Sequence, residues 1–292
     1  MLIDLHIHSK SCSDGNMTVE EIIREAKVRN IELMSITDHD SIDCQEKAKT
    51  LARKNGICYV SGVELNVTFS HPRHCKGRSI SLDLLGYNFD IKNKGLTKRL
   101  RQIRKYREER AARILEKLNV EFEKEGIKKL TRNDLKKIRD SVDGVLGRPH
   151  IASYLMKKGI VGTKQEAFDK YLVKCDVSKF PLLVEQASRL VRNAGGIVVL
   201  AHPNDPYGTS LVRLTRSLHE QTKIIEESIL KYIDGVECWH SRNDDSTTSH
   251  YVKFVKKHGI IMTGGSDCHQ NPIIMGTVKI PEYVAEQFKV LT

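Results

Sequence analysis

The 292-residue sequence predicts an α/β protein built on a parallel sheet or barrel and interrupted by an all-helical insertion. The first observation is that short apolar segments alternate with helical patterns over residues 1–95. The second is that the same alternation resumes over residues 181–292. The third is that residues 96–180 carry a helical pattern alone. We therefore expect an α/β body in two parts, 1–95 and 181–292, separated by a helical insertion at 96–180.

The first eight residues are typical of a strand with two different faces. Side chains alternate along a strand, so Asp4, His6 and His8 share one face, and the isoleucine and leucine residues between them share the other. The apolar face belongs in a hydrophobic core. The other face directs two imidazoles to the same place, as a site for Zn, Mn or Fe requires.

The following elements continue the alternation. Thr18 and Glu21 form a capping box that starts a helix, and a second helix ends near Gly56. The further strands are expected at residues 33–36, 58–63, 81–85, 197–200, 235–239 and 260–263.

Four helices are expected in the insertion. The apolar residues from Leu96 to Leu118 approximate helical spacing in a long, very basic helix. Thr131 caps a second helix, Pro149 stands at the start of a third, and Thr163 opens a capping box for a fourth.

Composition limits the class of protein. With 39% hydrophobic and 29% charged residues, the chain is ordinary for a soluble protein, and no apolar run approaches the roughly 20 residues of a membrane span. No signal peptide is visible, and the seven cysteines include no CxxC pair, so we expect a cytoplasmic protein with reduced thiols. No protein partner is inferable.

Cys12 and Cys268 lie beside candidate ligands and could serve as thiolates, although the oxygen and nitrogen ligands nearby already suffice.

The net charge of +11 comes from one segment. Between Lys92 and Arg139 the sequence has 18 Lys and Arg but 7 Asp and Glu, whereas the rest of the chain holds 30 of each. A solvated helix face explains such a surplus, but a neutral body with one basic segment also suggests a localised field that attracts polyanions.

Histidine and carboxylate clusters follow the ends of the predicted strands. Active sites of α/β sheets and barrels lie at these carboxyl ends, where residues far apart in sequence converge. More ligands are present than one ion uses, so two or three divalent ions are expected, with Glu64 as a bridge. Ions about 3.5–4 Å apart activate a hydroxide and hold both oxygens of phosphoryl transfer. The set is His6, His8, Asp14, His39, Glu64, Asp83, His202, Asp267 and His269.

These motifs resemble those of the PHP (polymerase and histidinol phosphatase) superfamily. The insertion, with Gly147-Arg148-Pro149-His150, is similar to the nucleotide phosphatase branch that includes nucleoside 3′,5′-bisphosphate phosphatases and RNase AM. The resemblance implies a distorted (β/α)7 barrel around a trinuclear metal site, with the insertion as a cap. The motifs that carry it are His6-Ile-His8, Thr37-Asp-His39, Gly62-Val-Glu64, Ala201-His202-Pro and Gly265-Ser-Asp267-Cys-His269.

The resemblance also implies which residues bind each ion. The first ion would take His6, His8, Glu64 and Asp267. The second would share Glu64 and take Asp83 and His202, and the third would take Asp14, His39 and His269. Asp4 and Asp38 are expected to orient the imidazole ligands without binding an ion themselves.

One position departs from the branch. Three residues before the glycine of Leu84-Leu85-Gly86 the branch commonly has histidine, and this chain has Asp83. A carboxylate oxygen is a harder ligand than an imidazole nitrogen, so an aspartate at this position favours Mn, Mg or Fe over Zn. His74 or His71, in the loop after Glu64, could fill the position instead; we favour Asp83.

Three further residues are candidates for phosphate binding or proton transfer. Arg148 is suited to bidentate contact with phosphate, and His150 is a donor beside it. His240 ends a predicted strand on the same rim, where it could hold phosphate or protonate a leaving oxygen. The alternatives are that Arg148 only lies near a helix start and that His240 is structural.

The sequence therefore predicts a metal-dependent phosphoesterase in which a metal-bridging hydroxide attacks phosphorus. The expected substrates are AMP, a 3′,5′-bisphosphonucleotide or the 5′ end of a short RNA, and Mn is the expected metal, with Fe, Zn or Mg as alternatives. A histidinol-phosphate-type phosphatase is disfavoured because its small substrate gives no reason for so basic a cap. A non-catalytic nucleic-acid-binding module is disfavoured because buried charged clusters are costly without metal.

Overall fold

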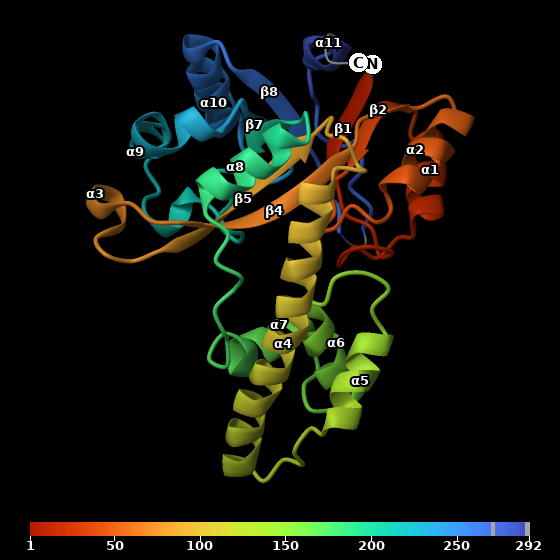
Figure 1. Ribbon diagram of the computed structural model, residues 1–292, viewed down its shortest axis with the longest axis vertical. Coiled ribbons are helices and arrows are strands. Elements are labelled where there is room, and N and C mark those ends of the chain that lie inside the picture. Colours follow the sequence, from red (N-terminus) through yellow and green to blue (C-terminus); the bar gives the residue numbers. More distant parts are fainter. Residues whose placement is uncertain (270–271, 290–292) are drawn as a thin grey trace.

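The computed structural model describes residues 1–269 and 272–289. They form two sheets covered by helices, and a helical lobe that extends away from both sheets (Figure 1). No helix in these two ranges is both long and apolar enough to cross a membrane.

The first sheet contains three parallel strands. Its order is β1 (Leu2–Ile7), β2 (Ile31–Ile36) and β3 (Cys58–Tyr59). Helices α1 (Val19–Val28) and α2 (Gln45–Lys54) connect these strands, as the alternating pattern predicts. Both faces of β1 are buried, the apolar face in the core and the histidine face toward the cleft described below.

The second sheet is mixed. Strands β4 and β5 are antiparallel, β5 and β6 are antiparallel, and β6, β7 and β8 are parallel. The strands are β4 (Gly62–Phe69), β5 (Ile80–Tyr87), β6 (Ile197–Leu200), β7 (Gly235–His240) and β8 (Ile261–Gly265). A parallel sheet was expected here. Residues 70–79 alone join β4 to β5, with the short α3 (Pro72–Cys75) among them, and a parallel crossover needs a dozen or more residues.

The predicted (β/α)7 barrel is not closed in the part of the chain described. The two sheets share one hydrophobic core, and backbone hydrogen bonds join them at strand ends, where Asp267 N donates to His6 O at 2.8 Å and Glu64 N donates to Asp38 O at 3.2 Å. These short bridges bring the ends of β1, β2, β4 and β8 together without making one continuous sheet. The carboxyl ends therefore still converge, which is what positions the candidate site.

Helices cover the outer surfaces of the second sheet. Its core includes Leu85, Val199 and Val236, all fully buried. The covering helices and short turns are α8 (Val184–Asn193), η2 (Leu211–Arg213), α9 (Leu218–Ile224), η3 (Ile225–Ile229), η4 (Leu230–Tyr232), α10 (Asp245–His258) and α11 (Tyr283–Lys289).

The helical lobe, defined here as residues 111–177, has its own apolar core. The 31-residue α4 (Lys94–Lys124) joins the two parts: Leu96 and Leu100 lie in the sheet core, and Ile114 and Phe122 lie in the lobe core. The remaining lobe elements are α5 (Arg132–Asp140), α6 (Arg148–Lys157), α7 (Lys164–Ala167) and the π-helical turn η1 (Phe168–Leu172).

The predicted helix starts at Thr18, Thr131 and Thr163 are confirmed. Each threonine hydroxyl accepts a hydrogen bond from the backbone N–H three residues later, so each helix begins where its cap satisfies an otherwise unpaired donor.

Candidate metal centre

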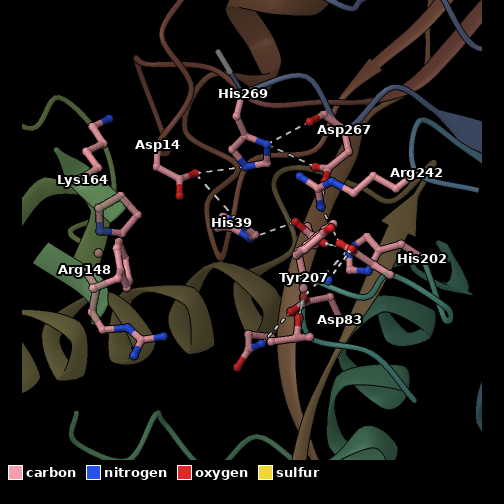
Figure 2. A pocket seen from close by; sticks show the side chains of 18 of the residues that line it. Asp14, His39, Asp83, Arg148, Lys164, His202, Tyr207, Arg242, Asp267 and His269 are labelled. Atoms are coloured by element: carbon pink, nitrogen blue, oxygen red, sulfur yellow. Dashed lines mark hydrogen bonds and ion pairs between the residues drawn. The ribbon is translucent and has the colours of Figure 1, made fainter. Parts of the chain in front are cut away.

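A cleft of about 600 Å³ lies between the strand ends of the two sheets and the helical lobe. Seven of the nine predicted metal ligands line this cleft, and the other two, His6 and His8, are buried in contact with Glu64 and Asp267 (Figure 2 shows part of the group). A series of short contacts connects all nine. Imidazoles and carboxylates alternate in this series, so each cationic or neutral nitrogen faces a carboxylate oxygen.

Four of the nine residues surround one point. Nε2 of His6 lies 3.1 Å from Nε2 of His8, and both nitrogens face Glu64 Oε2, at 3.6 and 3.2 Å. Both also face Asp267 Oδ1, at 3.4 and 3.3 Å. Ligands about 2.1 Å from a tetrahedral ion lie about 3.4 Å from one another. The two imidazole nitrogens therefore have the spacing of metal ligands to each other and to both carboxylate oxygens, and His6, His8 and Asp267 offer three atoms that could hold one ion.

The bonding of these atoms also fits a metal ion. His6 Nδ1 lies 2.9 Å from Glu237 Oε1, so the ring proton is placed on Nδ1 and the Nε2 lone pair faces the other ligands. Glu64 Oε2 and Asp267 Oδ1 are buried and face imidazole nitrogens, but among residues 1–269 and 272–289 neither accepts a hydrogen bond of good geometry. Buried carboxylate oxygens surrounded by imidazoles in this way are expected where a cation is the shared partner.

A second group extends from the other oxygen of Glu64. Oε1 of Glu64 lies 3.0 Å from His202 Nε2, which in turn lies 3.9 Å from Asp83 Oδ2. Asp83 Oδ1 accepts from Asn66 Nδ2 at 2.6 Å, and its Oδ2 accepts from the Thr209 hydroxyl. Asp83 therefore stands beside the cluster with its carboxylate already oriented.

The alternative histidines for that position lie elsewhere. His71 and His74 stand at α3, which Figure 1 shows at the far tip of the β4–β5 hairpin. His74 Nε2 is paired with Glu227 Oε2 at 3.0 Å, so this ring has a partner outside the cluster.

A third group lies toward the open side of the cleft. Asp14 Oδ1 faces Nε2 of His269 at 3.4 Å and Nε2 of His39 at 3.8 Å (Figure 2). His39 Nδ1 reaches Glu64 Oε2 at 2.8 Å, which connects this group to the first. The ring of His269 is stacked on that of His8, with centroids 3.9 Å apart.

The ionisation of the cluster follows from these contacts. Burial opposes charge on every member, but the His39 and His6 imidazoles hold the pKa of Glu64 well below its usual range. Burial lowers the pKa of His39, but the Glu64 and Asp14 carboxylates outweigh it and raise that pKa to about 9. Glu64 raises the pKa of His202 to about 9 in the same way. Protons and a divalent cation therefore compete for the same nitrogens.

Buried carboxylates brace the cluster. Besides His6, Glu237 accepts from the backbone N–H of His202 at 2.8 Å. Asp4 accepts from the Ser266 and Gly276 N–H groups, and Asp38 accepts from Ser9. We expected Asp4 and Asp38 to orient imidazoles; no hydrogen bond from either reaches an imidazole in the described part of the chain. They instead fix the backbone of the loops that carry the ligands.

The backbone itself is unusual at two ligands. His202 (φ 24°) and Asp267 (φ 54°) adopt the left-handed region that non-glycine residues rarely occupy. Each lies two residues after the end of a strand, β6 or β8, and its side chain lines the cleft. Conformations of this kind persist where the surrounding structure fixes them and are concentrated at functional sites.

The three predicted phosphate-binding residues have different surroundings. Arg148 lines the cleft, donates to Asp176 Oδ2 at 2.8 Å, and its guanidinium lies 5.5 Å from the centre of the Phe168 ring. His150 Nδ1 accepts from Gly147 N at 3.0 Å, so it caps α6. His240 is fully buried behind Asp267, with its Nε2 3.4 Å from Asp267 Oδ2, and it does not line the cleft.

Several cleft residues were missed by the sequence analysis. Arg242 lies 3.8 Å from Asp267 and pairs with the buried Asp205, and Lys179 faces the cleft without an ion pair among the described residues. They follow strands or helices by two or more residues, in loops where periodicity carries no signal. Glu237 had a signal, an acidic residue inside the apolar strand β7.

Comparison with known proteins adds independent information. A family model described as PHP domain matches residues 4–245. A 5′-3′ exoribonuclease of Haemophilus influenzae is 32% identical over 68% of each chain. A 3′,5′-nucleoside bisphosphate phosphatase of Chromobacterium violaceum is 28% identical over 91% of this chain and 87% of its own. The solved structure of an amidohydrolase from Chromobacterium violaceum with bound sulfate superposes with a TM-score of 0.79 at 26% identity, covering 100% of this chain and 97% of that one.

Proposed function

The chain belongs to the PHP-domain family, and on that basis we propose that it is a metal-dependent phosphoesterase that removes phosphate from nucleotides or from the 5′ ends of short RNAs. The observation that carries this proposal is that Nε2 of His6 and Nε2 of His8 each lie 3.1–3.6 Å from the other and from a carboxylate oxygen of Glu64 and of Asp267. The names of the related nucleases and nucleotide phosphatases support the substrate class.

We propose two to three divalent ions, in the positions that the three groups define. The first group would hold one ion, Glu64 would be shared with a second at His202 and Asp83, and a third would bind at Asp14, His39 and His269. Mixed oxygen and nitrogen ligands suit Mn, with Fe, Zn or Mg as alternatives. When bound, such ions supply Lewis-acid activation of water and neutralise charge on the phosphate oxygens.

The protein side chains then bind and orient the substrate. Arg148 enters the cleft from the lobe and Arg242 from the opposite rim, so a phosphate on the ligand cluster lies between two guanidinium groups. We propose that His240 acts as a positioning residue for Asp267, because its ring lies against that carboxylate and is buried. His150 similarly fixes the start of α6 and thereby Arg148.

A substrate panel tests this function. We expect Mn-loaded protein to hydrolyse AMP, a nucleoside 3′,5′-bisphosphate or a short 5′-phosphorylated RNA with a higher kcat/KM than histidinol phosphate. Preference for histidinol phosphate would favour a small-molecule phosphatase. RNA binding without hydrolysis of any ester would favour a non-catalytic module.

The first prediction concerns Asp83. Asp83→Ala is expected to remove up to one ion per chain and to lower activity by about 100-fold, because it completes the second group beside His202. His74→Ala should change neither quantity, since His74 is paired with Glu227. Elemental analysis and initial rates measure both effects. Asp83→His should remain active, and damage by His74→Ala instead would contradict the assignment.

The second prediction concerns the basic helix α4. Lys98, Arg101 and Lys105 are exposed, whereas Arg104 is paired with Asp43. Changing these three exposed residues to Glu is expected to raise KM for an oligonucleotide selectively, since AMP makes fewer electrostatic contacts. KM for the oligonucleotide should also rise more steeply with salt, because each phosphate contact on a single strand contributes a slope of about −0.7 in log affinity against log salt.

A matched control replaces the exposed Lys49, Arg53 and Lys54 of α2 with Glu, which changes the net charge equally away from the cleft. Equal effects of the two triple variants, or equal salt slopes for both substrates, would mean that the basic surface of α4 is a solvated face that does not bind the oligonucleotide.

A further inference from the structure

An aromatic side chain stands exposed at the mouth of the cleft. Tyr207 lines the cleft with His202 and Asp83, yet 82% of its surface is accessible to solvent. Figure 2 shows it beside these two residues. A large ring left in water next to a buried cluster is not accounted for by packing, because packing would bury it.

The turn that carries Tyr207 is firmly held. The buried Asp205 accepts from the Tyr207 backbone N–H at 2.9 Å and forms an ion pair with Arg242. Asp205 N donates in turn to His202 O at 3.0 Å. The following residue is Gly208, where a Cβ atom would collide with the Asp205 carboxylate. The ring is therefore presented from a fixed backbone that is bonded to a candidate metal ligand.

The ring itself has no partner within the protein. Across residues 1–269 and 272–289, no ring contact, ion pair or side-chain hydrogen bond involves Tyr207. The other aromatic residue of the cleft, Phe168, is covered by the Arg148 guanidinium and lies against the lobe core. Tyr207 is thus the aromatic face that the cleft offers to a ligand.

We propose that Tyr207 is the stacking platform for the nucleobase of the substrate, and that it distinguishes nucleotides from phosphate esters without a base. This inference rests on the proposed function, because it places the phosphate at the ligand cluster and the base outward at the rim. A cleft of about 600 Å³ has room for both. Every base has an aromatic face, so the platform accepts any base and selects for the presence of one.

The experiment compares AMP with ribose 5-phosphate, which carries the same phosphate and sugar but no base. In Tyr207→Ala, KM for AMP is expected to rise about tenfold with kcat unchanged, and both constants for ribose 5-phosphate are expected to stay the same. Tyr207→Phe keeps the ring and should behave as the unmodified protein. Tyr283→Ala, which removes another exposed tyrosine on α11 outside the cleft, is the matched control.

A binding measurement separates failure of this inference from failure of the proposed function. Saturation-transfer NMR with AMP should show transfer to the adenine protons in the Mg-loaded unmodified protein and in Tyr207→Phe, with loss in Tyr207→Ala. Absence of hydrolysis with this pattern retained would overturn the phosphoesterase and keep the platform. An equal rise of KM for both esters, or unchanged adenine signals in Tyr207→Ala, would overturn the platform and leave the phosphoesterase standing.

Discussion

His8→Ala and Asp267→Ala are each expected to lower phosphoesterase activity by about 10³-fold or more, since Lewis-acid stabilisation by a bound ion contributes several kcal/mol and each 1.36 kcal/mol is a factor of ten. Both side chains contribute an atom to the group of His6, His8 and Asp267, and each substitution removes one of these candidate ligands. Metal content by elemental analysis should fall together with the rate.

The control is His219→Ala, which removes an exposed histidine outside the cleft. Its activity and metal content should match the unmodified protein, and circular dichroism should show the same fold in all three variants. At most one ion per chain in the unmodified protein after loading with Mn would contradict a multinuclear site, whatever the variants do.

Metal binding is expected to stabilise the protein by an amount that grows with pH. An ion present at about 1,000 times its Kd contributes about 4 kcal/mol, which corresponds to about a 10 °C rise in Tm for a chain of this size. His39 and His202 have pKa values of about 9 and must lose their protons to bind metal. The rise in Tm on adding Mn should therefore be much larger at pH 8 than at pH 6, as measured by differential scanning fluorimetry.

The free energy of unfolding of the metal-free protein should instead fall as the pH rises. Both histidines have folded-state pKa values of about 9, above the unfolded value of about 6.5. Their stabilising contribution is complete below about pH 6.5 and is lost as pH rises to about 9. Titration calorimetry of Mn binding at pH 7.5, in buffers of different ionisation enthalpy, should detect net proton release, and the release should be smaller in His202→Asn. A Tm shift independent of pH would contradict this linkage.

The sequence predicted the convergence of the candidate ligands better than the sheet that carries them. His6 and His8 alternate on a strand bounded by apolar residues, and the spacing of a strand leaves one geometry for them. The hairpin of β4 and β5 was not predicted, because both strands were assigned by apolar content and only the short connection over residues 70–79 reveals their antiparallel pairing.

The surroundings of the ligands were harder to predict. Arg242, Asp205 and Tyr207 depend on a long loop whose path is set by buried ion pairs and not by any periodic pattern. The predicted phosphate contacts of His150 and His240 rested on their position in the sequence. The structure shows that neighbouring bonds decide their orientation, with Gly147 N donating to one ring and Asp267 lying against the other.

The two ends of the long segment between β5 and β6 lie side by side. Asp90 N donates to Ala194 O at 2.8 Å, and Asn93 Nδ2 donates to Asn193 O at 3.2 Å. Within this segment the start of α4 and the whole of α8 pack on the sheet, whereas the helical lobe has its own apolar core. The lobe can therefore be lengthened, shortened or exchanged at little cost to the sheet. The candidate metal ligands all come from outside the lobe, whereas Arg148 comes from within it. Natural variation can therefore change which polyanion is admitted, by replacing one contiguous stretch of gene, while the chemistry of hydrolysis is inherited intact.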